Sequence, residues 1–215
     1  LRILLDGTRE LARDHVLVRL LFINALSFGL LMAYLSAAPF VLRNVLGMGT
    51  VAYTAVFGLC GATVTVTIAV AASLVRRFSQ ARQVRVGLIA GLVVDTVFAG
   101  VCLMWLREPV TGPERMPLLV AVVALFLAHV ACLGLSMGNA PALALDRTGR
   151  WAGTGSALLG FLQFVIGGLV SPLVGLTGEA SGAAFGVVIV AVGAVANILA
   201  VFGLRERGEK QRLGQ

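Results

Sequence analysis

Two ionisable side chains, Asp95 and His129, lie deep inside apolar segments of the 215-residue chain. A charged aspartate at the centre of a lipid bilayer costs about 2.5 to 3.5 kcal/mol, so it needs a partner or must hold a proton. The two segments follow each other along the chain, and consecutive antiparallel helices usually pack together. At about 1.5 Å of rise per residue, both side chains reach the middle of the membrane. We therefore predict a hydrogen bond or ion pair between Asp95 and His129, which either fixes helix packing or relays protons.

Uncharged polar and small side chains recur at helical spacing in two other segments. The segment 20–41 carries Asn24 and Tyr34 on one stripe. The segment 154–176 carries a longer stripe, which consists of Ser156, Gly160, Gln163, Gly167, Ser171 and Gly175. Small residues let helices approach closely in lipid, and polar side chains form hydrogen bonds between helices. These stripes are predicted either to hold helices together or to line a substrate cavity, and Pro172 is predicted to act as a hinge.

The sequence lacks the residue groupings of an enzyme or a metal site. No glycine-rich loop with a following Lys-Ser/Thr is present to hold a nucleotide phosphate. Ser156 and His129 could suggest an intramembrane serine protease, but Ser156 is expected near a membrane surface and His129 at the midplane. The three cysteines lie inside apolar segments without metal-ligand spacing, and Asp95 alone cannot form a metal site. We predict no catalytic residue, no metal and no cofactor.

The composition places these side chains in a membrane. The chain is 59% hydrophobic and 13% charged, which is more apolar surface than the interior of one soluble domain can hold. Six apolar runs are long enough to cross a hydrocarbon core of about 30 Å; they are 20–41, 51–75, 86–106, 117–137, 154–176 and 183–204. The predicted fold class is an all-α integral membrane protein with six transmembrane helices.

The segments outside the six runs are polar. Residues 1–19 are predicted to form a cytoplasmic linker that lies on the membrane surface, and residues 205–215 a disordered cytoplasmic tail. Pro141 is expected to break or bend the fourth helix near its inner end. The chain begins at Leu1 without an initiator methionine, so we expect it to be a piece of a longer protein.

The positive charges predict the orientation in the membrane. Fourteen of the 17 Lys and Arg residues fall on one side of the six runs, and cytoplasmic loops carry an excess of these residues. Both termini are therefore predicted to be cytoplasmic, in the inner or plasma membrane of the cell. The net charge of +7 is explained by loops that lie near anionic lipid headgroups, and no basic stretch interleaves with aromatic residues as a nucleic-acid groove would.

Several stretches together resemble a known family of membrane proteins. They are 10–14 (ELARD), 36–42 (SAAPFVL), 74–79 (LVRRFS), 142–146 (ALALD), 152–164 (AGTGSALLGFLQF) and 171–175 (SPLVG). Their order and spacing resemble the second half of major facilitator superfamily drug exporters of the bicyclomycin and chloramphenicol resistance (Bcr/CflA) type. The resemblance implies helices seven to twelve of a twelve-helix bacterial antiporter, with the first six-helix half as an absent partner.

The resemblance also implies roles for individual residues. The first, second, fourth and fifth spans would line a central cavity for a small hydrophobic drug, with Asn24, Tyr34, Gln163 and His129 directed towards it. The third and sixth spans would lie outside, which makes Asp95 a packing residue rather than the proton carrier.

The inner-loop motif of the family falls on Arg76 and Arg77, although Ala72 and Arg76 stand where the motif has a glycine and an aspartate. The predicted function is proton-coupled export of hydrophobic drugs and antibiotics by alternating access. Two alternatives remain open, namely a major facilitator transporter of a metabolite such as a sugar or amino acid, and a six-helix membrane protein that binds a partner without transporting.

Overall fold

The computed structural model describes the backbone of residues 2–176 and 182–213, and the side chains of residues 6–176 and 182–201. Its helices are α1 (Arg2–Leu11), α2 (His15–Pro39), η1 (Phe40–Val45), α3 (Thr50–Leu74), α4 (Gln80–Trp105), α5 (Arg115–Leu145), η2 (Gly149–Trp151), α6 (Ala152–Leu173) and α7 (Ala183–Leu213). Over these ranges the chain contains helices and connections but no strand. Six helices are long and apolar enough to cross a membrane. This confirms the predicted all-α fold with six spans.

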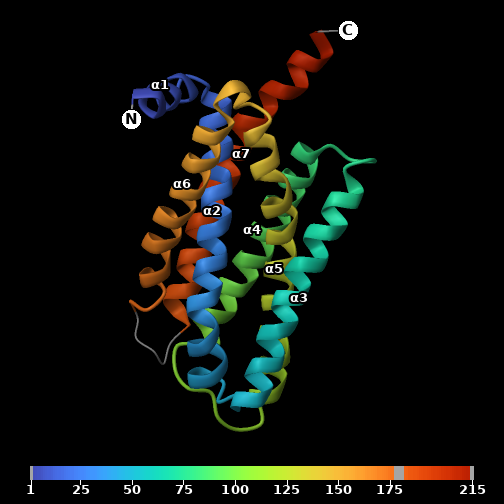
Figure 1. Ribbon diagram of the computed structural model, residues 1–215. Coiled ribbons are helices and arrows are strands. Elements are labelled where there is room, and N and C mark those ends of the chain that lie inside the picture. The colour runs from blue at the N-terminus through green and yellow to red at the C-terminus, as the bar shows by residue number, and fades with distance from the viewer. Residues whose placement is uncertain (1, 177–181, 214–215) are drawn as a thin grey trace.

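Four of the six long helices lie side by side in one layer, and two pack behind it (Figure 1). The order in the front layer is α3, α5, α2, α6, because α3 packs against α5, α5 against α2, and α2 against α6. The back pair is α4 and α7, which pack against each other, α4 also against α5 and α7 also against α2. The two middle helices of the front layer are therefore enclosed, while α3 and α6 form its edges.

An aromatic cluster joins the two layers. The ring of Phe98 on α4 lies 4.8 Å from that of Phe126 on α5 and 5.2 Å from that of Phe185 on α7, measured between centroids. Tyr34 on α2 completes the cluster with its ring 5.2 Å from that of Phe126. All four side chains are at most 3% exposed. Edge-to-face pairs of this kind add about 0.5 to 1.5 kcal/mol each beyond their buried area, so this cluster fixes the back pair against the front layer.

Glycines allow the back pair to approach its neighbours closely. A Cβ atom built on Gly87 of α4 would lie 2.9 Å from the backbone oxygen of Cys132 on α5. A Cβ atom on Gly186 of α7 would lie 2.9 Å from the Cα atom of Ala99 on α4. These distances are too short for a real side chain, and so both helix crossings depend on the absence of one.

The first span ends differently from the prediction. We expected it to stop at residue 41, but a π-helical turn, η1, carries it on to Val45. The amide of Leu46 donates to the carbonyl of Val41 at 3.0 Å, a bond across five residues. Gly47 then ends the helix with φ of +60°, a conformation that glycine adopts without strain. The guanidinium of Arg115 donates to the carbonyl oxygens of Leu46 and Gly47, which caps this end.

Two other helix ends differ from the prediction. Helix α5 continues through Pro141 to Leu145 without a break, because a proline removes a single intrahelical hydrogen bond and lies here in the last two turns; a bend at Pro141 stays a prediction. Residues 205–213, expected to be disordered, continue helix α7 to Leu213. Arg, Glu, Lys, Gln and Leu dominate this stretch, and all of them favour a helix. Residues 214 and 215 lie outside the described part.

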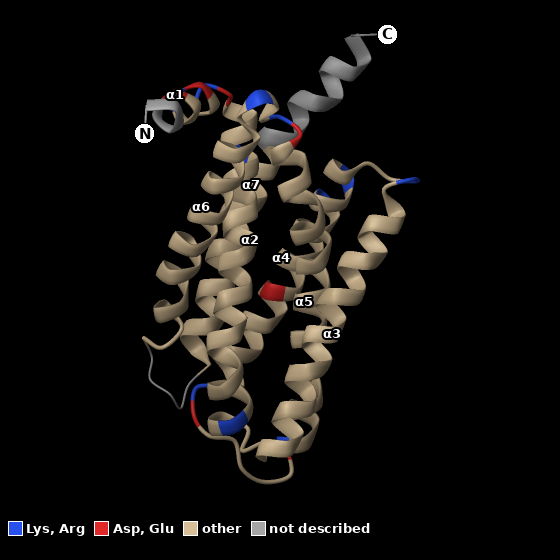
Figure 2. Cartoon of the chain, viewed as in Figure 1, with Lys and Arg blue, Asp and Glu red and all other residues tan. Residues whose placement is uncertain are grey.

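The connections at the two ends carry the charges (Figure 2). Helix α1 lies across the end of the bundle that also holds the α3–α4 and α5–α6 connections (Figure 1). Two ion pairs tie the N-terminal segment to the α5–α6 connection, Arg147 with Asp14 at 2.7 Å and Arg150 with Glu10 at 2.7 Å. Figure 2 shows an acidic position inside the bundle, about midway along α4. The acidic residue in this part of α4 is Asp95.

Candidate functional site

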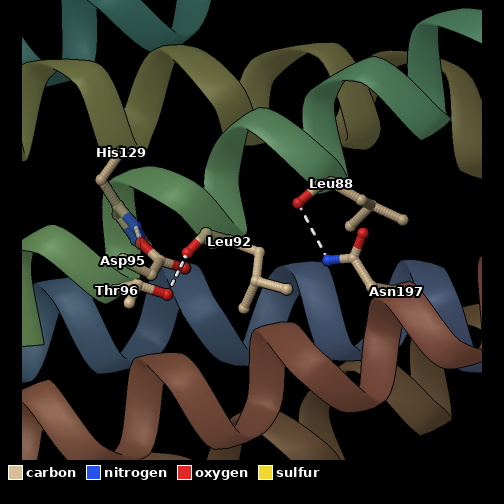
Figure 3. Close-up of polar contacts among 6 residues, drawn as sticks. All are labelled: Leu88, Leu92, Asp95, Thr96, His129 and Asn197. Atoms are coloured by element: carbon tan, nitrogen blue, oxygen red, sulfur yellow. Dashed lines mark hydrogen bonds and ion pairs between the residues drawn. The ribbon is translucent and has the colours of Figure 1, made fainter.

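Asp95 and His129 meet in the interior between α4 and α5. His129 Nδ1 lies 2.5 Å from Asp95 Oδ1, and each residue is 1% exposed. Figure 3 shows the two side chains directed towards each other, with α7 alongside. The structure thus brings together the two ionisable residues that the sequence pairs. A polar or charged side chain in an apolar interior needs a partner, and Asp95 and His129 supply one for each other.

The surroundings of this pair are small and nearly closed. Gly193 of α7 lies beside the carboxylate, since a Cβ atom there would be 3.3 Å from Asp95 Oδ2. A void of about 10 Å³ adjoins the pair and is also lined by Ser136 and Cys132. Among the described residues, His129 Nε2 and Ser136 Oγ have no hydrogen-bond partner. A void of this size is at the lower limit for a single water molecule, so no substrate fits beside the pair.

His129 does not face the front of the molecule. We expected it to point towards a cavity in the front layer, but its side chain is directed at α4 and belongs to the packing with the back pair. The reason is that α5 is enclosed, with α3 and α2 on its sides and α4 behind. The polar side chain of His129 forms its hydrogen bond towards α4, because a polar side chain in an apolar interior must find a partner.

Two amide side chains extend the polar contacts of the back pair along α4. Asn197 of α7 donates from Nδ2 to the carbonyl oxygen of Leu88 on α4 at 2.9 Å (Figure 3), and also to Gly193 of its own helix. Asn139 of α5 donates to Gln83 Oε1 of α4 at 3.2 Å. Sequence reasoning missed the Gln83 contact, because Gln83 stands in an arginine-rich stretch expected to be a loop, whereas α4 already begins at Gln80.

A second polar seam joins α2 and α6 in the front layer. Gln163 Nε2 lies 3.5 Å from Asn24 Oδ1, and the hydroxyl oxygens of Ser36 and Ser171 lie 2.5 Å apart. Gly167 lies between these two contacts, where a Cβ atom would come within 3.0 Å of the Phe28 ring. The predicted stripe on α6 therefore packs against α2 through these three residues. Asn24 Nδ2 has no hydrogen-bond partner among the described residues.

The remaining residues of the α6 stripe are not packed. No described atom lies within 4 Å of the position that a Cβ on Gly160 would take, and Ser156 is exposed. Gly175 lies beyond the last residue of α6, Leu173. Pro172 is the second-last residue of that helix, so a hinge there would act at the helix end and remains a prediction.

Tyr34 faces the α3 side of α2. Its ring stacks on Phe57 of α3, with centroids 6.0 Å apart and planes 16° apart. It is 3% exposed, and its hydroxyl interacts with the thiol of Cys60 on α3. These contacts direct Tyr34 towards α3, and a place for it in a substrate cavity stays a prediction.

Helix α3 turns its small and polar face outwards. The exposed residues of this face are Thr54, Gly58, Gly61 and Thr65. The threonine hydroxyls donate to carbonyls of their own helix, for example Thr65 to Gly61 at 3.0 Å. Neither glycine has a described atom within 4 Å of the position that a Cβ would take. A face of small residues suits close contact with another helix, yet nothing in the described part of the chain covers it.

The N-terminal segment holds the α5–α6 connection through its acidic side chains. The hydrogen bond from Arg150 lowers the pKa of Glu10 below its usual value. Partial burial alone would raise the pKa of Asp14, but the backbone N–H of Leu17 and the guanidinium of Arg147 outweigh it, so this pKa is also lowered. Both carboxylates are therefore ionised near neutral pH. Arg76 and Arg77 of the predicted inner-loop motif are exposed at the α3–α4 connection.

One curated protein that is similar to this chain is described as an uncharacterized MFS-type transporter, YdgK, from Bacillus subtilis (strain 168). The two are 29% identical over 198 residues, which cover 90% of this chain and 43% of the relative. The chain therefore spans less than half the length of the curated relative that it matches. No family model matches the chain, and no solved structure matches it.

Proposed function

We propose that this chain is the second six-helix half of a major facilitator superfamily transporter of the bacterial cytoplasmic membrane. The observation that carries the proposal is the similarity to an MFS-type transporter, which extends over 90% of this chain but only 43% of the relative. A match of this kind is expected when one chain corresponds to one half of a longer protein. Both termini would be cytoplasmic, on the side of the cation-rich connections.

The arrangement of the helices supports this proposal. Helices α2, α3, α5 and α6 form the front layer, and α4 and α7 lie behind it; this is the grouping that the resemblance assigns to cavity-lining and outer helices. The front layer also carries the uncovered small-residue face of α3 and the open Gly160 of α6. A second bundle that meets these edges would enclose a space in front of α2 and α5, and rocking of the two bundles would expose it alternately to either side.

The side chains near this space suit a hydrophobic substrate. Phe57 and Tyr53 of α3 and the exposed Phe161 and Phe164 of α6 supply aromatic surface. Asn24 and Gln163 supply amides at the α2–α6 seam. The described segments of α2, α3 and α6 carry no acidic residue inside the helices. Aromatic surface with a few uncharged polar groups binds apolar drugs without demanding one shape, and we propose export of such drugs in exchange for protons.

The Asp95–His129 pair takes one of two roles in such a transporter. It lies behind the front layer in a void too small for a substrate, which favours a role in holding α4 against α5. A proton relay remains the alternative, since the pair is ionisable and lies inside the bundle. The proton carrier for drug export would then lie either here or in the absent first half.

The first test is the source DNA upstream of Leu1. Six further apolar spans in the same reading frame would support the proposal, whereas a start codon just before Leu1 without such spans would favour a non-transporting partner-binding protein. The second test uses the full-length protein in vesicles that are acidic inside. A hydrophobic drug should discharge the pH gradient in a protein-dependent way. Discharge by sugars or amino acids, but not by drugs, would make it a metabolite transporter.

A further inference from the structure

A cavity of about 310 Å³ opens between the two helices of the back pair, near the cation-rich end of the bundle. Its lining consists of Arg85, Ile89, Asn197, Ala200 and Val201. Two of its lining residues, Ile89 and Val201, are exposed on the surface of α4 and α7, so the cavity opens to the surroundings of the bundle. A molecule in this cavity would therefore approach from the surrounding lipid and not from the proposed transport pathway.

Arg85 gives the cavity a positive charge that nothing described neutralises. The residue is half-buried, and its Nε has no hydrogen-bond partner among the described residues. No acidic residue occurs on α4 before Asp95, ten residues or about 15 Å further along the helix. The described side chains of α7, residues 183–201, include no acid either. A buried guanidinium N–H without an acceptor is costly, so an anionic group is the expected complement.

Asn197 adds a hydrogen-bond acceptor to the same wall. Both of its hydrogen bonds, to Leu88 and to Gly193, use the amide nitrogen Nδ2. The amide oxygen takes no part in either bond, and the two bonds fix the amide group in place; Figure 3 shows the bond to Leu88. An acceptor next to a guanidinium suits a ligand that combines a phosphate with hydroxyl donors, as a glycerol-type headgroup does.

The rest of the surface around the cavity is apolar and faces outwards. Ile89 is 59% exposed and Val201 is 49% exposed. Along the same two helices the exposed large side chains continue as Val86, Val93 and Val97 on α4 and Val187, Val195 and Ile198 on α7. An acyl chain can lie along such a surface, whereas a water-soluble phosphate gains nothing from it. The pattern of one cation at the end of an apolar strip matches an anionic lipid.

We propose that the cavity between α4 and α7 is a binding site for one anionic phospholipid, with its phosphate on Arg85, its headgroup hydroxyls on Asn197 Oδ1, and an acyl chain against Ile89 and Val201. The site is independent of the proposed transport function. It would hold equally in a non-transporting membrane protein.

Native mass spectrometry of the purified chain tests this site. The protein is released from mixed micelles that contain phosphatidylglycerol and phosphatidylcholine in equal amounts. We expect one retained phosphatidylglycerol per protein in preference to phosphatidylcholine. Arg85→Gln should lower this retention about fivefold or more, which is the contribution of one arginine beside an anionic lipid. Arg82→Gln removes the same charge one turn earlier on α4, at an exposed residue outside the cavity, and should leave the retention unchanged.

Two further measurements test whether the lipid binds in the cavity itself. Val201→Trp places a large side chain at the mouth of the cavity from an exposed position, and should also abolish the preference while every charge remains. Inorganic phosphate at millimolar concentration should not displace the lipid. The proposal is overturned if Arg82→Gln weakens retention as much as Arg85→Gln, if Val201→Trp has no effect, or if phosphate alone competes. Equal elution and thermal unfolding of the variants in detergent establish that they are folded.

Discussion

Two glycines of the back pair and three glycines on the edges of the front layer have opposite surroundings. Gly87 and Gly186 of the back pair lie where any side chain would collide with a neighbouring helix. Gly58, Gly61 and Gly160 of the front edges have open space at the equivalent position. In lipid, a small residue allows a neighbouring helix to approach closely. The packed glycines account for helix contacts within this chain. The open glycines indicate a surface suited to contact with another helix.

The exposed side chains of the back pair also differ from those of the front edge helix α3. On α4 and α7 they are large and aliphatic, which suits acyl chains. On α3 they alternate between apolar residues and the small or hydroxyl residues of its exposed face. Lipid therefore suffices to cover the back, whereas the front favours protein or substrate. This contrast yields four predictions.

The largest effect is expected from breaking the polar contact between α4 of the back pair and α5 of the front layer. His129→Leu leaves Asp95 buried without its partner and should lower the free energy of unfolding by about 3 to 5 kcal/mol. Urea or SDS unfolding of the purified protein in detergent measures this loss. The double variant Asp95→Leu/His129→Leu replaces both groups by apolar ones and should recover most of it. If the double variant is as unstable as the single one, the two side chains contribute to stability in another way than by neutralising each other.

A smaller effect separates the two classes of glycine. Gly87→Ala introduces a methyl group against the α5 backbone and should destabilise the bundle by about 1 to 3 kcal/mol. Gly58→Ala is the matched control, and it should leave stability unchanged or raise it by up to about 1 kcal/mol, because alanine favours the helix. Thermal unfolding in detergent compares the two. If both changes destabilise equally, the α3 face is covered within this chain and the contrast fails.

The front seam should matter more for function than for stability. Gln163→Leu removes a 3.5 Å contact to Asn24, and contacts of this kind in membranes contribute about 0.6 kcal/mol on average. The unfolding midpoint should hardly change. In the full-length protein the same variant should alter the ratio of transport rates between two drugs of different polarity. An unchanged ratio would remove Gln163 from the substrate path.

The smallest effect concerns the N-terminal segment that holds the α6 edge. The pKa values of Glu10 and Asp14 are lowered in the folded state, so their contribution is complete above the ordinary carboxyl values and is lost as the pH falls through the lowered ones. Between about pH 6 and pH 3, the hydrogen-exchange protection factors of α1, which compare each rate with that of an unstructured chain at the same pH, should therefore fall while those of α4 do not. Arg150→Gln should lower the protection of α1 already at the upper end of this range. An equal fall of protection in α1 and α4 would indicate global loosening.

The sequence predicted the fold class well, because apolar length and charge asymmetry are properties of single segments. The Asp95–His129 contact also followed from depth alone, since both residues stand at the middle of consecutive runs. The cavity-facing direction that the family resemblance implied for His129 was wrong, because that direction depends on which helices surround α5. Gln83 was missed for a similar reason, since the start of α4 is set by Ser79, whose side chain accepts from the Arg82 amide. The contacts of Asp14 and Glu10 across more than 130 residues require the three-dimensional arrangement.

The π-helical turn at the end of the first span has a consequence for comparing relatives. Such a turn holds one residue more than an α-helical turn between the same two flanking positions. A related chain that lacks one residue between Phe40 and Val45 could therefore keep Pro39 on one side and the Gly47 cap on the other, with an ordinary α-helical end between them. A single-residue gap at this place in an alignment marks a change of helix type and leaves the register of the following span intact.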